Sequence, residues 1–284
     1  MRSAPYNVAD VREFLAEVAD VDGHPPLSEN KVTTLGRDMN RIGVWSDGEG
    51  LCLVAVAAWH AGHGHWAIEA AVAPRRRTAN DEKAAIERAT GLISTEEPHS
   101  FWAFRPGQVD AAGRLGYVQV RAVLRMSGPM PTAVLASVPG ISIGPMTVSD
   151  VEGIVAVNNS AFANHREQGS MTVEGFRALM TLAWFDPMGV HVARSGERIV
   201  GFCMTKHEEQ AVGEVYVLAV DPDRSGLGIG RALAQRGYAA MAASGAVTAR
   251  AWVDEDNRPA VGLYEVLGLV EDFRSREMVP ADRG

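Results

Sequence analysis

A glycine-rich turn between a strand and a helix is the feature that most restricts how this chain can fold. Small apolar residues at 217–220 lead into Asp221-Pro222, and glycines then alternate with other residues through 225–231. Glycines permit positive φ and leave backbone N–H groups unobstructed. Several such groups at a helix N-terminus form a site for a phosphate or diphosphate. The pattern therefore predicts a strand, an anion-binding loop and a helix over about 228–243.

The loop alone leaves two other interpretations open. A dinucleotide-binding turn would place an acidic residue at the end of the next strand, where Asp254 stands. A plain structural turn needs no ligand at all. The segments around the loop distinguish these interpretations.

The same order of predicted elements occurs twice in the 284 residues. Each half contains two helices, a set of strands, a helix, a strand, a helix and a final strand. The first half has helices at 8–18, 28–39, 81–94 and 109–115, and strands at 42–47, 51–59, 65–74, 100–105 and 118–126. The second half has a strand at 141–146, a helix ending at 162, a helix from 172, strands at 190–195, 198–206 and 213–222, the helix at 228–243, a strand at 247–253, a helix at 258–267 and a strand at 271–279.

This duplication predicts an α/β (α+β) protein of two tandem domains, each with a mixed central sheet flanked by helices. The halves are separated by a stretch rich in Pro, Gly, Ser and Ala, which has the composition of a linker. We therefore expect an N-terminal domain at 1–130, a linker at 131–140 and a C-terminal domain at 141–284.

Charge and hydropathy exclude several classes of function. The net charge of −8 argues against a nucleic-acid partner, because binding to phosphates needs clustered Lys and Arg. The longest apolar run, 51–59, is far shorter than the ~20 residues of a membrane span. Acidic residues occupy the N-terminus, where a signal peptide has its apolar core. We expect a cytoplasmic monomer with no membrane partner, and reduced core thiols at Cys52 and Cys203.

The glycine loop and a segment downstream of it together resemble the GNAT acetyltransferases. The loop is similar to their motif A, and Asn257–Leu269, with its capping Asn, its Tyr and its Leu-Gly turn, is similar to motif B. The resemblance implies acetyl-CoA as cosubstrate, with its pyrophosphate on the loop and its pantetheine arm paired with the preceding strand. The implied CoA-binding residues are Leu218, Ala219, Val220, Ser225, Gly226, Leu227, Gly228, Ile229, Gly230, Arg231, Asn257, Arg258, Pro259, Ala260, Val261 and Gly262.

Acetyl transfer to an amine needs a base for the amine, and an acid assists the departing thiolate. Glu214 lies on the strand that enters the loop. Strand alternation places it on one face with Tyr216 and Leu218, and places Val215, Val217 and Ala219 on the other. A partly desolvated carboxylate suits a base, whereas an edge-strand Glu in water is the alternative.

The resemblance implies the base role for Glu214 and the acid role for Tyr264 in the motif B helix. The alternative for Tyr264 is packing of its helix on the sheet, and a buried Tyr can do both. A backbone N–H near Leu218 is the expected oxyanion donor.

More specific segments resemble the mycothiol synthases, a tandem-GNAT family. They include His165-Arg166-Glu167-Gln168-Gly169, Trp184-Phe185-Asp186-Pro187 and the strands around Lys206 and Glu214, and the likeness covers most of 141–279. It implies acetylation of the cysteinyl amine of Cys-GlcN-Ins (desacetylmycothiol), which gives mycothiol and CoA. Carboxylates suit the ammonium of this acceptor, and Lys with carboxylates suits its hydroxyls. The implied substrate contacts are Glu29, Glu167, Lys206, Glu214 and Trp252.

Three departures from these families affect the expectations. Ser225 replaces a Gln or Arg, which removes a long side chain from the phosphate and predicts weaker CoA binding. Trp252 replaces a Tyr, which removes a hydroxyl from the acceptor site. The N-terminal counterpart of the CoA loop, 73–80, has no glycine and carries three arginines, so it can attract phosphate but lacks the backbone nest. We expect a non-catalytic N-terminal domain that supports the acceptor site.

A histidine cluster and the choice of acceptor leave two further interpretations. His60, His63 and His65 lack the spacing of a known zinc site, so no metal is expected. The alternatives to a mycothiol synthase are a GNAT enzyme for another small amine and a non-catalytic acyl-CoA-binding protein. Glu214 and Tyr264 together argue against a mere binder, which needs neither.

Overall fold

The computed structural model describes residues 2–3, 6–33, 35, 40–60, 64–94, 96–132, 135–163, 169–208 and 211–281. The chain divides into two compact units. The first unit comprises Met1–Val123 and Phe273–Gly284, and the second comprises Leu124–Asp272. The predicted linker at 131–140 lies within the second unit, while the last segment of the chain groups with the first. The boundaries of independently folding domains stay a prediction.

The first unit is a mostly antiparallel sheet with helices on both faces. Its strands follow the order β1-β2-β3-β4-β5-β12, and β4 and β5 run parallel. Its helices are α1 (Val8–Asp22), α2 (Glu29–Thr33), α3 (Ala79–Thr90) and α4 (Pro106–Arg114). Its strands are β1 (Arg2–Ser3), β2 (Asn40–Asp47), β3 (Gly50–His60), β4 (His65–Val72) and β5 (His99–Ala103), while β6 (Tyr117–Pro129) and β12 (Val270–Pro280) have residues in both units.

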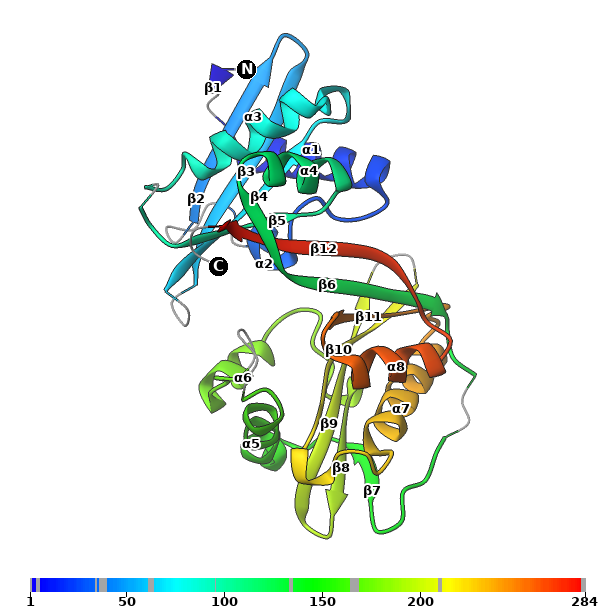
Figure 1. Cartoon of the computed structure of the whole chain (residues 1–284). Coiled ribbons are helices and arrows are strands. Elements are labelled where there is room, and N and C mark those ends of the chain that lie inside the picture. Colours follow the sequence, from blue (N-terminus) through cyan, green and yellow to red (C-terminus); the bar gives the residue numbers. More distant parts are fainter. Residues whose placement is uncertain are drawn as a thin grey trace. The chain divides into compact units, whose positions relative to one another are not determined.

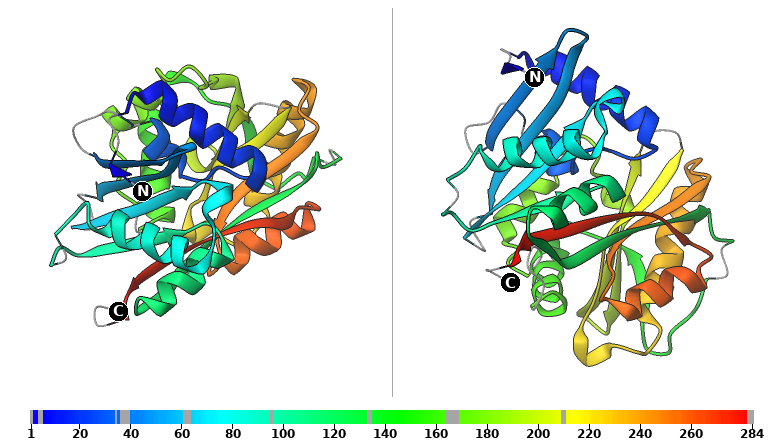
Figure 2. Two further views of the ribbon diagram at one scale, coloured as in Figure 1. Left: turned by 90° about the horizontal axis from the view of Figure 1, so that it is seen from above. Right: turned by 45° about the horizontal axis from the view of Figure 1, so that its top comes forward.

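Alternating side chains of β3 explain why both faces of this sheet are covered. Cys52, Val54 and Val56 pack against α1, whereas Leu53, Ala55 and Ala57 belong to the cluster that includes α3 and α4. The left view of Figure 2 shows α1, in dark blue, on one side of these strands and α3 and α4 on the other. A strand buried on both faces reads as a continuous apolar run, as 51–59 does.

The second unit repeats this architecture. Its strand order is β6-β11-β10-β9-β8-β7, and β10 is antiparallel to β9 but parallel to β11. Figure 1 shows α5 and α6 on one side of these strands and α7 and α8 on the other. The helices are α5 (Val151–Ala161), α6 (Val173–Leu179), α7 (Ile229–Ala243) and α8 (Arg258–Val266). The strands are β7 (Ser142–Pro145), β8 (Val190–Ser195), β9 (Arg198–Glu208), β10 (Val212–Val220) and β11 (Thr248–Asp254).

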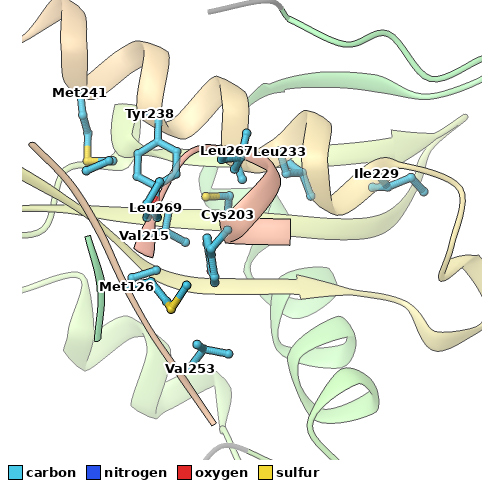
Figure 3. Close-up of a cluster of buried hydrophobic side chains, with 14 of the residues drawn as sticks. Met126, Cys203, Val215, Ile229, Leu233, Tyr238, Met241, Val253, Leu267 and Leu269 are labelled. Atoms are coloured by element: carbon cyan, nitrogen blue, oxygen red, sulfur yellow. The ribbon is translucent and has the colours of Figure 1, made fainter. Parts of the chain in front are cut away.

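The α7 face of the second unit holds a tightly packed apolar cluster (Figure 3). Leu233, Tyr238 and Met241 of the alanine-rich helix α7 face the strands. They pack in one cluster with Cys203 of β9 and Val215 of β10. Small residues bring the helix close to the sheet: a Cβ at Gly237 would lie 3.0 Å from Cys203 Sγ. Burial raises the pKa of Cys203 to about 12, so this residue is an inert core thiol, as the sequence predicts.

The predicted order of elements is confirmed in both halves, with differences at helix ends. The second helix, expected over 28–39, ends at Thr33, and 34 and 36–39 lie outside the described residues. The helix expected before 162 begins as a 3-10 turn at Val148–Asp150, capped by Thr147. No helix among the described residues is long and apolar enough to cross a membrane.

Candidate active site

The second unit opens its sheet at the end of β10. β10 pairs with β11 only over Val212–Val215, whereas its pairing with β9 continues to Val220. In the described part of the chain, no side chain donates a hydrogen bond to the Leu218 or Val220 carbonyl. The free edge of β10 can therefore accept an extended ligand as an added strand. This geometry fits the predicted pantetheine contacts at Leu218, Ala219 and Val220.

A β-bulge at Tyr216 overturns part of the predicted side-chain alternation. Val215 opposes Thr205 and Val217 opposes Met204, so Tyr216 is the additional residue. Tyr216, Val217 and Ala219 consequently pack on the α5 face, and Leu218 packs on the α7 face. The predicted faces are therefore wrong for Val217, Leu218 and Ala219, because the bulge reverses the alternation after Tyr216. Leu218 lies on the face of Val215, and Val217 and Ala219 lie on the face of Tyr216.

The predicted phosphate loop has the backbone of an anion site. Gly226 and Gly228 have φ of 76° and 83°, the left-handed conformation that favours glycine. Gly228 precedes α7, and the first intrahelical bond runs from the Ala232 N–H to the Gly228 carbonyl. The N–H groups before Ala232 have no intrahelical acceptor and can bind a phosphate. Ser225, Gly226, Leu227 and Arg231 are exposed there, so the chain's residues fit the pyrophosphate of CoA.

The motif B segment forms α8 as predicted. The Asn257 side chain caps the helix by accepting a hydrogen bond from the Ala260 N–H at 3.2 Å, and Pro259 lies in its first turn. The predicted CoA contacts Arg258 and Ala260–Gly262 therefore lie in the first turns of the helix. Tyr264 follows them and is only 4 % exposed. Burial raises the pKa of the Tyr264 phenol well above its ordinary value, so the phenol stays protonated at neutral pH and can serve as an acid.

The carboxylate of Glu214 lies at the point where the sheet opens. Glu214 is 4 % exposed, and its Oε2 has no hydrogen-bond partner among the described atoms. Burial, with the charge of the neighbouring Glu208, raises the pKa of Glu214 to about 8, against the opposing effect of Lys206 and Arg250. A carboxyl group with such a proton affinity is matched to an α-amino group, whose ordinary pKa is about 8.

Lys206 stands directly opposite Glu214 on β9. Its side chain is 8 % exposed, and its Nζ lies 5.5 Å from the Trp184 ring and 5.8 Å from the Tyr216 ring. The two rings contact each other with centroids 4.9 Å apart. The structure thus brings Lys206 and Glu214 together and adds an aromatic wall of Trp184 and Tyr216. Sequence reasoning did not assign this wall, although both residues stand in family-specific segments.

The structure says less about the other three predicted acceptor contacts than about Glu214 and Lys206. Trp252 lies on β11, is 37 % exposed and has the Arg125 guanidinium 6.0 Å from its ring. Glu29 is the first residue of α2, in the first unit. Glu167 lies outside the described residues. The substrate roles of these three residues stay predictions.

The first unit carries the same strand opening, but its own side chains occupy it. β4 pairs with β5 only over Trp66–Glu69. Beyond that point Gln108 Nε2 donates to the Ala70 carbonyl at 2.8 Å, and Arg77 Nη2 donates to the Val72 carbonyl at 3.2 Å. The hollow beside this edge, which Ala70, Val72 and Gln108 line, has no space for a water-sized molecule, so it cannot hold a ligand.

The three arginines of the first unit's loop are also occupied. Arg75 and Arg76 both pair with Asp47, at 3.2 and 3.0 Å, and Arg77 pairs with Asp22 at 2.5 Å. Glu49 lies 3.0 Å from Arg75 and Asp81 lies 3.7 Å from Arg76, so carboxylates of the same unit balance all three charges. The helix that follows is capped by Thr78 and Asp81 rather than by a glycine nest.

We expect one acetyl-CoA to bind per chain, in the second unit, because the first unit's strand edge and cations already have partners. Isothermal titration calorimetry of the full chain with acetyl-CoA measures the stoichiometry. Gln108→Ala frees the Ala70 carbonyl and serves as the comparison. A stoichiometry of two in the unaltered chain would contradict the closed edge.

Comparison with known proteins agrees with this geometry. The model of the Acetyltransferase (GNAT) family matches residues 159–269. A GCN5-related N-acetyltransferase from Sphaerobacter thermophilus superposes with a TM-score of 0.76 at 19 % identity, covering 98 % of this chain and 94 % of that one. A tandem GNAT protein from the clavulanic acid biosynthesis pathway superposes with a TM-score of 0.65 at 14 % identity, over 95 % and 93 % of the two chains. These structures confirm the tandem GNAT fold.

Similarity in sequence identifies the family more narrowly than similarity in fold does. The mycothiol acetyltransferase of Geodermatophilus obscurus is 35 % identical, over 94 % of this chain and 92 % of the relative. That of Thermomonospora curvata is 37 % identical, over 90 % and 88 %. Because the identity extends over both units and nearly the full length of the relatives, the chain belongs to the mycothiol acetyltransferase family of GNAT proteins.

Proposed function

We propose that this protein is an acetyl-CoA-dependent N-acetyltransferase that acetylates the cysteinyl amine of desacetylmycothiol, Cys-GlcN-Ins. The observation that carries the proposal is the buried Glu214 carboxyl group at the opening between β10 and β11, with Lys206 opposite it. A base whose proton affinity matches an α-amino group is thereby held next to the free strand edge where the pantetheine arm would pair. The family membership supports the same acceptor.

The residues of the second unit supply each proton transfer. Glu214 takes a proton from the cysteinyl ammonium, and the freed nitrogen attacks the acetyl carbonyl carbon, forming the C–N bond. Backbone N–H groups near the bulge at Tyr216 are suited to stabilise the oxyanion. The C–S bond then breaks, and Tyr264 donates its phenolic proton to the departing thiolate. The attacking nitrogen gives up its second proton, which restores the phenol, and Glu214 releases its proton to solvent. Overall, one ammonium and one thioester give one amide, one thiol and one free proton.

A mass-spectrometric assay tests this function. The protein is incubated with acetyl-CoA and, in separate reactions, with Cys-GlcN-Ins or simple amines, and fragmentation locates the added acetyl group. Detection by mass avoids thiol dyes, which the acceptor's own thiol would consume. Acetylation of the cysteinyl nitrogen supports the proposal. Turnover of another amine only would show that the acceptor is a different small molecule, as the replacement of the family's Tyr by Trp252 would allow. The absence of any turnover would favour an acyl-CoA-binding protein.

Replacing Tyr264 with Phe tests the acid. The variant keeps the ring that packs in the core and removes only the hydroxyl, so we expect kcat to fall about 100-fold while the affinity for acetyl-CoA is retained. Tyr238→Phe is the matched control, because the Tyr238 hydroxyl is also buried but donates to the Arg250 carbonyl at 3.0 Å. It should cost about 1 kcal/mol of stability and leave kcat unchanged. Equal kcat for both variants would remove the acid role from Tyr264.

A further inference from the structure

An ion pair crosses the middle strand of the site. Arg250 Nη1 on β11 donates to Glu208 Oε2 on β9, and β10 lies between these two strands. The pair therefore passes over β10 on one face of the sheet. The Glu208 side chain is about three-quarters buried, with 26 % exposed.

The face that the ion pair crosses is the face of Glu214. Glu214 is the direct neighbour of Arg250 on β11 and of Lys206 on β9, and residues paired directly across strands point to the same side. Glu208 follows two residues after Lys206 on β9 and shares its side. Ala249 and Ala251, which flank Arg250, pack in the α7 cluster, so Arg250 points to the opposite face, with Glu214.

We propose that the Glu208–Arg250 ion pair is a positioning device that holds a carboxylate beside Glu214 and keeps the balancing arginine turned toward that carboxylate instead of toward Glu214. This inference rests on the proposed role of Glu214 as the base. Glu208 and Arg250 are positioning residues, because they act through Glu214.

The charges around Glu214 explain the effect of this arrangement. From the strands, Lys206 and Arg250 favour the ionised carboxylate, whereas Glu208 opposes it. From the helices, burial is the main cause of the raised pKa values of the Tyr238 and Tyr264 phenols, and the charge of the nearby Glu214 adds to it. Burial of Glu214 is the largest cause of its raised pKa, and the two cations oppose it. The carboxylate of Glu208 adds to the effect of burial and offsets the cations, which helps Glu214 to bind a proton in the range of an α-amino group.

Two charge-removing variants test the proposal with opposite expected results. Glu208→Gln removes the repelling carboxylate and leaves Arg250 to interact with Glu214, so the pKa of Glu214 should fall by about 1–3 units. Arg250→Met removes a cation and should raise it. The double variant, Glu208→Gln with Arg250→Met, removes both charges of the pair, so it leaves neither partner unpaired. Comparing its stability with that of the single variants separates effects on folding from effects of charge. Glu152→Gln breaks the exposed Arg177–Glu152 pair, 3.2 Å in length, and should change nothing.

The readout is a carbon-13 NMR titration of the glutamate carboxyl groups in the full chain, with Glu214 assigned by its loss in Glu214→Gln. Shifts of opposite sign in the two single variants support the positioning device. Shifts of the same sign, or none larger than in Glu152→Gln, would overturn it. The pH dependence of kcat is measured in parallel: if the titrations shift but kcat does not follow, the base assignment fails while the positioning device stands.

Discussion

Replacing Glu214 with Gln should lower kcat about 10²–10⁴-fold, the usual contribution of a general base. Gln has the shape of Glu but cannot take a proton from the cysteinyl ammonium. The loop that we propose binds CoA follows the other end of β10, so the affinity for acetyl-CoA should not change. Mass-spectrometric turnover rates and calorimetric acetyl-CoA binding, measured on the same preparations, check both parts.

The stability of Glu214→Gln separates loss of catalysis from loss of folding. The raised pKa of Glu214 means that the folded protein binds this proton more tightly than the unfolded chain, whose pKa is near 4.5. Stability of the native protein should therefore decrease as the pH rises from about 4.5 to about 8. The variant lacks this decrease, so its Tm at pH 8 should equal or exceed that of the native protein. Full turnover with acetyl-CoA still bound would exclude Glu214 as the base.

The second large effect is expected at the phosphate loop. Gly228→Val places a β-branched residue at a φ of 83°, which costs about 1–3 kcal/mol or forces the loop into another conformation. Either change displaces the N–H groups that precede α7. Each charge-assisted hydrogen bond to a phosphate contributes about 1.5–3 kcal/mol, so losing one or two raises the KM for acetyl-CoA at least tenfold.

Gly245→Val is the matched control for this variant. Gly245 follows the other end of α7 with a φ of 96°, and a Cβ at either glycine meets no neighbour within 4 Å. Both variants should lose similar stability, but only Gly228→Val should weaken acetyl-CoA binding. Equal KM values for acetyl-CoA in the two variants would show that the loop does not hold the pyrophosphate.

Local patterns predicted most of the fold, because each depends on neighbours in the chain. The apolar run 51–59 became β3, buried on both faces, and the alternating glycines of 225–231 gave the positive φ values that the loop needs. The capping role of Asn257 was also visible in its position before Pro259. These features need no information from distant segments.

The parts that could not be predicted depend on contacts between distant segments. The bulge at Tyr216 is a mismatch between β10 and β9, and nothing in the alternation of 213–222 reveals it. Glu208 and Arg250 are 42 residues apart in the chain, and they meet because their strands, β9 and β11, both lie beside β10 in the sheet. Gln108 closes the edge of β4 from 38 residues away. A search for opposite charges at matching strand positions could have found the Glu208–Arg250 pair. It could not have found the hydrogen bond by which Gln108 closes the edge of β4.

The most direct measurement of the acceptor assignment is a competition. Cys-GlcN-Ins is mixed with its two halves, cysteine and GlcN-Ins, at equal concentrations with limiting acetyl-CoA, and the products are counted by mass. We expect the whole acceptor to be acetylated on its cysteinyl nitrogen with kcat/KM at least about 100-fold above either half, because a site built for both parts gains binding energy from each. Acetylation of cysteine or of the glucosamine nitrogen at a comparable rate would contradict the assignment of Cys-GlcN-Ins as the substrate.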